Sequence, residues 1–143
     1  MENIIKWVQA AAFAVGGVIG AFLGGFDGVL TALLICIGLD IVTGILRAGV
    51  EKKINSSVCF KGMCKKVTIL VLVGLAWAID IYVIKTAGVI RTATIFFYIA
   101  NEGISILENA AIIGLPIPKK IRDVLEQLKK KAEDTEEGGS GDE

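Results

Sequence analysis

The side chains that could carry chemistry in this 143-residue sequence are few, and histidine is absent. Three cysteines occur, Cys36, Cys59 and Cys64, and their spacing is not typical of a zinc site. An odd number of cysteines excludes a closed disulfide framework, so we expect free thiols. No nucleophile is paired with a base either. The sequence therefore predicts a protein that is not an enzyme, without a metal or cofactor site.

Four acidic side chains stand inside apolar segments: Asp40, Asp80, Glu102 and Glu108. An ionised carboxylate near the middle of a bilayer costs roughly 2.5–3.5 kcal/mol on insertion scales, so none of them can face lipid. Two interpretations stay open. The acids pair across helices or cap neighbouring backbone, or some of them face water in an assembled state.

Segment 92–113 concentrates the polar groups on one side. At about 100° per residue, the polar side chains from 91 to 109, apart from Thr92, fall within an arc of about 120°. This predicted polar seam contains Tyr98, Asn101, Glu102, Ser105, Glu108 and Asn109. We therefore predict a helix that is apolar on one side and faces protein, or the water of a pore, with the other.

Segment 29–46 shows a smaller polar face, on which Asp40, Thr43 and Arg47 recur at helical spacing. Small residues dominate the segment before it. Gly16, Gly20 and Gly24 lie four residues apart, and such rows let helix backbones approach closely in lipid. We predict a helix-packing face there, either against the second helix or against another subunit.

The elements that carry these groups are membrane spans. Hydrophobic residues make up 54% of the chain, and mean hydropathy is +0.68. Four runs reach or approach the roughly 20 apolar residues that a span needs. They are 7–26, 29–46, 67–84 and 92–113. The predicted fold is an all-α, polytopic membrane domain over 1–118 with four transmembrane helices. A three-span alternative, with 92–113 on the membrane surface, stays open.

Basic residues indicate the orientation. Residues 47–66 hold six basic side chains and one acidic one, and residues 119–131 hold six basic and two acidic. Because Lys and Arg near span ends favour the cytoplasm, both termini and the 47–66 loop are predicted to be cytoplasmic. Apart from Phe60, the aromatic residues lie outside these blocks, so the blocks predict no nucleic-acid partner.

Residues 119–131 predict a basic amphipathic helix with an apolar stripe. It either lies on an anionic inner leaflet or packs on the cytoplasmic loop or a partner. The acidic residues 132–143 predict a disordered tail.

Several motifs resemble one family. They are D-x-x-T-G at 40–44, S-S-V-C-F-K-G-M-C-K-K at 56–66, F-F-Y-I-A-N-E-G-I-S-I-L-E-N at 96–109 and G-L-P-I-P-K-K at 114–120. Together they resemble the bacteriophage holin family that includes clostridial toxin-secretion holins, over roughly residues 28–131.

The resemblance implies a protein that accumulates in the bacterial host's inner membrane, oligomerises and opens lesions. An endolysin, or in some relatives a toxin, passes through them, and the host lyses. The implied partners are further copies of the chain, the lipid bilayer and an endolysin that need not touch it. The alternatives are a small ion channel or transporter, or a membrane scaffold without pore activity.

Overall fold

The structure is a computed structural model that describes residues 1–138 of the chain, with side chains to residue 135. Every regular element in this part is helical, so the all-α prediction is confirmed. The elements are α1 (Glu2–Phe22), α2 (Gly28–Val50), α3 (Ser56–Ala78), the π-helical turn η1 (Ile79–Ile84) that continues α3, α4 (Val89–Ile113) and α5 (Lys119–Gly138).

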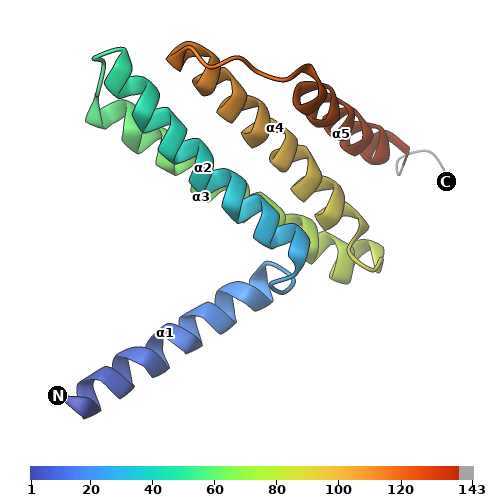
Figure 1. Cartoon of the computed structure of the whole chain (residues 1–143). Helices are drawn as coiled ribbons and strands as arrows, with labels where there is room; N and C mark the ends of the chain where they lie inside the picture. The colour runs from blue at the N-terminus through green and yellow to red at the C-terminus, as the bar shows by residue number, and fades with distance from the viewer. Residues whose placement is uncertain (139–143) are drawn as a thin grey trace.

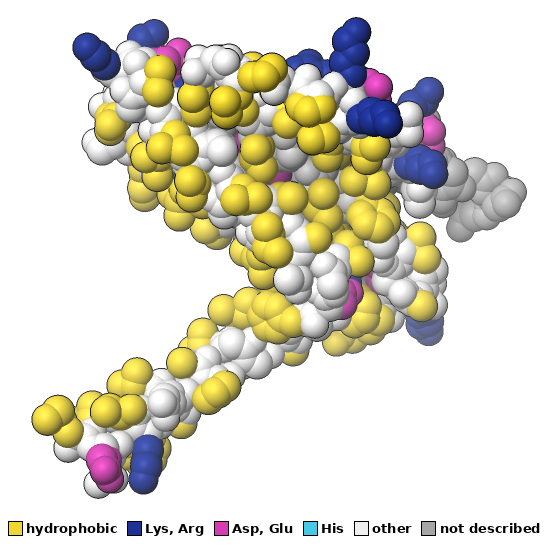
Figure 2. Space-filling model, in the orientation of Figure 1, with side chains coloured by type: hydrophobic (Ala, Val, Ile, Leu, Met, Phe, Trp, Pro, Cys, Tyr) yellow, Lys and Arg dark blue, Asp and Glu magenta, His cyan; other side chains and the backbone are white. Residues whose placement is uncertain are grey.

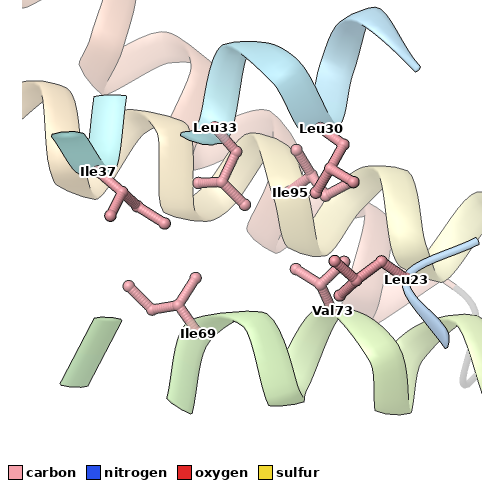
Figure 3. Packing of buried hydrophobic residues seen from close by; sticks show 7 residues of the cluster. All are labelled: Leu23, Leu30, Leu33, Ile37, Ile69, Val73 and Ile95. Carbon is pink, nitrogen blue, oxygen red and sulfur yellow. The ribbon is translucent and has the colours of Figure 1, made fainter. Parts of the chain in front are cut away.

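Helices α2, α3 and α4 form a bundle, and α5 lies along α4 (Figure 1). The core lies between the three bundle helices. Leu30 and Leu33 of α2, Val73 of α3 and Ile95 of α4 are fully buried there, and they point toward one another in Figure 3. Helix α1 leaves this bundle and extends away from it (Figure 1). Most of its surface therefore has no protein neighbour.

Three helical stretches of the described part are long and apolar enough to cross a membrane: Glu2–Phe22, Gly28–Val50 and Ser56–Ile84. Helix α4 is long enough at 25 residues, but its charged side chains keep it out of this group. The structure thus supports a membrane protein in which three helices are long and apolar enough to span the bilayer. A fourth crossing has to be argued from packing.

The helix bounds differ from the predicted ones for local reasons. Helix α1 ends at Phe22, before the predicted end at 26, because Gly24 and Gly25 adopt positive φ values in the following turn. Helix α3 begins at Ser56 rather than 67. The Asn55 side chain caps it by accepting a hydrogen bond from the Ser57 amide at 2.9 Å.

The end of the chain differs most from the prediction. Helix α5 continues to Gly138, so residues 132–138 of the predicted disordered tail are helical. The prediction for the last five positions, 139–143, lies outside the described residues.

Candidate functional site

A half-buried lysine between two buried carboxylates links the three bundle helices. Lys66 of α3 lies with its Nζ 2.5 Å from Oδ2 of Asp40 on α2, and it also contacts Oε2 of Glu102 on α4. Asp40 is 9% exposed and Glu102 is 6% exposed. We call these three residues the buried triad. Its two carboxylates share one ammonium group, so α4 is held to α2 through a side chain of α3.

Asn109 extends the buried triad along α2. Its Nδ2 donates to Oδ1 of Asp40 at 3.2 Å and to Oγ1 of Thr43 at 3.1 Å. Its Oδ1 accepts from Nη1 of Arg47 at 3.4 Å, and Arg47 in turn pairs with Glu51 at 3.1 Å. The polar face of α2 and part of the α4 seam therefore satisfy each other inside the bundle.

A second polar cluster lies at the other end of the bundle, around Arg91 of α4. Its guanidinium donates to the carbonyls of Leu23 at 2.5 Å and Gly25 at 2.9 Å, and to Oδ2 of Asp27 at 2.7 Å. The ring of Trp77 lies 5.9 Å from its Cζ. One side chain thus fixes the α1–α2 turn against α3 and α4.

Asp27 has two partners in this cluster. The hydrogen bond from Arg91 holds the pKa of the Asp27 carboxyl below its ordinary value, although partial burial opposes this shift. Its Oδ1 also accepts from the Leu30 amide at 2.9 Å, which caps the start of α2.

Asp80 lies in η1, but its carboxylate contacts the first turn of α4. Its carboxylate accepts from the amides of Ile90 at 3.1 Å and Arg91 at 2.8 Å, and from Oγ1 of Thr86. A carboxylate at a helix N-terminus satisfies free amides and complements the helix dipole. Asp80 is fully buried and fully partnered, so its role in this structure is structural.

The structure divides the predicted seam of α4. Glu102 and Asn109 are buried in the polar network, and Tyr98 packs on the hydrophobic core. Asn101 and Ser105 are half-buried, and Glu108 is exposed. Asn101 also lines an open groove of about 590 Å³ between α3 and α4. Tyr98 and Glu102 line the same groove. Glu102 and Asn109 therefore anchor α4, whereas Asn101, Ser105 and Glu108 form an edge of the seam that stays partly or fully exposed.

The predicted glycine face has mixed surroundings. A Cβ at Gly20 would lie 2.7 Å from the ring of Phe26, and Gly24 sits in the turn against Trp77 and Arg91. Around Gly16 no atom lies within 4 Å of such a Cβ. Among the described residues, the middle of α1 therefore has no packing partner on this face.

Sequence reasoning missed Lys66 and the partners of Arg91. Because Lys66 precedes the apolar run of α3, the sequence predicts a place for it in the cytoplasmic loop. The sequence held only part of the signal: Asp40 and Glu102 need a cation, but both Lys66 and Lys85 directly adjoin that apolar run. The contacts of Arg91 with backbone carbonyls have no such signal.

Helix α5 packs antiparallel to α4. A Cβ at Gly103 would lie 2.8 Å from Leu125, which shows how closely the two helices approach. Farther along, Nζ of Lys129 lies 5.7 Å from the centroid of the Phe97 ring. Ala132 is only 4% exposed. Charged side chains gather over α5 and at the α2–α3 end of the bundle, whereas α1 carries many hydrophobic ones (Figure 2).

Comparisons with known proteins agree with this architecture. The chain matches the bacteriophage holin family over residues 17–130. It is 38% identical over 131 residues to the 14.9 kDa protein of the nagH 3′ region of Clostridium perfringens, covering 92% of this chain and 99% of that relative. It is 40% identical over 105 residues to a probable holin of Bacillus phage phi105, covering 73% of this chain and 77% of the phage protein. No solved structure matches. The extent of the family match and the phage relative show that this chain belongs to the bacteriophage holin family of pore-forming membrane proteins.

Proposed function

We propose that this protein is a holin that oligomerises in the bacterial inner membrane and opens lesions, through which an endolysin reaches the cell wall and lyses the host. Family membership supports this function. The observation that carries it furthest in the structure is the buried triad. Charged groups of three helices are enclosed between membrane-length apolar segments, and a polar edge of α4 remains open beside them.

We propose four crossings of the membrane, with α4 as the fourth. Helix α4 lies level with α2 from end to end, because Arg91 meets Asp27 and Asn109 meets Thr43. If α2 crosses, α4 lies at the same depth. Glu102 is then satisfied by Lys66 of α3 and Arg91 by the α1–α2 turn, whereas Glu108 stays exposed.

The charge distribution supports the orientation. Lys52 and Lys53 lie in the α2–α3 connection, and Lys61 and Lys65 follow early in α3. Basic residues at this end of the bundle favour a cytoplasmic position for the α2–α3 connection. A crossing by α1 then brings the N-terminus to the same side. The α1–α2 turn and the α3–α4 connection lie on the outer side.

We propose that the open edge of the seam, formed by Asn101, Ser105 and Glu108, faces the water of the lesion. Glu102, Asn109 and Tyr98 hold α4 on the bundle in the conformation described above. If these three also reach water, the assembled state must differ from this conformation.

The test is induced expression in a bacterium, with and without a co-expressed endolysin. We expect an abrupt loss of viability and release of a cytoplasmic enzyme when both proteins are present. Endolysin alone serves as the control and should leave the cells intact. An ion-selective current without any escape of protein would identify a channel and contradict the proposal.

A further inference from the structure

The position of α5 carries a further inference, which rests on the proposed crossing of α2, α3 and α4. Helix α5 lies beside α4 from Gly103, where Leu125 packs, to the α3–α4 connection. A cavity at that connection is lined by Ala87 and Gly88 together with Ala132 and Thr135 of α5. Much of α5 is therefore level with the part of α4 that we place inside the bilayer.

The outer face of α5 cannot lie in lipid at this depth. Between 122 and 134 it exposes charged side chains at Arg122, Asp123, Glu126, Lys130, Glu133 and Asp134. Charges inside a membrane face a protein interior or a water-filled cavity. Within residues 1–138, the helix that packs on α5 is α4, and its outer side is exposed.

The opposite surface of the molecule has the reverse character. Helix α2 exposes Ile35, Leu39 and Val42, at 50–56% of their surface, along one apolar stripe. Side chains of this kind are suited to lipid. At one depth, then, the molecule has an apolar surface on α2 and a charged surface on α5.

We infer that the outer face of α5 is the water-contacting wall of the lesion, while α2 faces the lipid. A subunit with lipid on one side and water on the other belongs at the rim of an opening. The open edge of the α4 seam continues this wall at Asn101 and Glu108. Such a placement brings the C-terminal end of α5 to the outer side of the membrane, in contrast to the cytoplasmic C-terminus expected from the sequence.

The first test asks whether α5 stays on α4 when lesions form. Cys36, Cys59 and Cys64 are replaced by serine, and Gly103→Cys is combined with Leu125→Cys in the full chain. Cγ of Leu125 lies 3.4 Å from the position of a Cβ at 103, which is close enough for a disulfide. The same double variant kept reduced is the matched control, because Leu125→Cys removes the side chain with which Gly103→Cys alone would collide. We expect the oxidised pair to release a dye from lipid vesicles at the same rate as the reduced pair.

The second test reports what each face contacts in the oxidised pair. In a background with Trp7→Phe and Trp77→Phe, a tryptophan is placed on α5 by Glu126→Trp or on α2 by Val42→Trp. Acrylamide quenches tryptophan from water, and phospholipids with brominated chains quench it from the hydrocarbon. We expect acrylamide alone to quench position 126 and brominated lipid alone to quench position 42.

Each other result overturns the inference in a distinct way. Dye release that begins only after reduction shows that α5 must leave α4. Protection of position 126 from both quenchers shows that α5 packs on another protein surface. Quenching of position 126 by brominated lipid, or its failure to quench position 42, shows that the bundle is placed differently. If the unmodified protein releases no dye, the proposed lesion fails, but the two tryptophans still report where α5 lies.

Discussion

Lys66 is the residue on which the charge balance of the bundle depends. It faces two carboxylates, Asp40 and Glu102, and no other described cation pairs with either of them. Removing one partner of a buried ion pair is costly, because the remaining charge is left buried and uncompensated. We therefore expect Lys66→Met to destabilise the folded protein by about 3–5 kcal/mol. The thermal unfolding of detergent-solubilised protein measures this loss.

The acidic partners provide the matched controls. Glu102→Gln keeps an acceptor for Lys66 and removes the second negative charge, so we expect a much smaller loss than for Lys66→Met. Adding Asp40→Asn and Glu102→Gln to Lys66→Met should restore most of the stability. A triple variant as unstable as Lys66→Met alone would show that packing of the lysine stem, and not its charge, holds the helices together.

The lowered pKa of Asp27 predicts that the folded protein loses stability in acid. Its pKa is lowered in the folded protein by Arg91, so its contribution to stability is fully present above the pKa of the unfolded state. That contribution is lost as the pH falls through the folded-state pKa. We expect Asp27→Asn, which keeps an N-cap acceptor but loses the ion pair, to be less stable at neutral pH and less sensitive to acid.

Unfolding midpoints of both proteins between neutral and strongly acidic pH check this prediction. The informative quantity is the difference between them, because other carboxylates titrate in both. Parallel curves would mean that the contact between Asp27 and Arg91 adds nothing to stability.

At the scale of single residues, the sequence identified the acidic residues inside apolar segments but not the side chains that pair with them. The cost of burying charge singles out Asp40, Asp80, Glu102 and Glu108, and the structure buries the first three and leaves Glu108 exposed. Their partners depend on helix rotation and register. A shift of one residue in α3 would turn Lys66 away, and no local pattern specifies that register.

At the scale of elements, α1 is the helix with the fewest contacts. Gly16 has open space around it in the single chain. If its face packs against another subunit, Gly16→Leu should reduce oligomers and delay lysis while leaving the folded chain intact. Ala14→Leu adds a similar side chain to another exposed face of α1 and is the control. Cross-linking in membranes measures the oligomers.

The choice of position 16 rather than 20 makes this prediction sharper. A side chain at Gly20 would collide with Phe26 of the same chain, so its effect would not report on assembly. Equal oligomers and equal lysis times for Gly16→Leu and the parent protein would remove α1 from the interface.

The helices themselves were largely predictable, and their ends were not. Apolar runs located α1 to α4, because hydropathy depends on composition alone. The start of α3 at Ser56 depends on the cap at Asn55, and the end of α1 depends on two glycines with positive φ. The stripe of α5 was also visible in the sequence, but its partner was not, since an apolar stripe fits a membrane surface and a neighbouring helix equally well.

At the scale of the whole molecule, the proposed orientation in the membrane can be tested by thiol labelling. Cys59 and Cys64 are exposed near the start of α3, on the side that we propose to be cytoplasmic. A membrane-impermeant thiol reagent should leave them unlabelled in intact spheroplasts and label them once the membrane is breached. A cysteine introduced by Lys85→Cys, at the opposite end of the bundle, should be labelled in the intact spheroplasts. Cys36 is half-buried within α2 and should stay unlabelled in both. Labelling of Cys59 and Cys64 before the breach, with protection of position 85, would reverse the orientation and with it the side to which α5 carries the C-terminus.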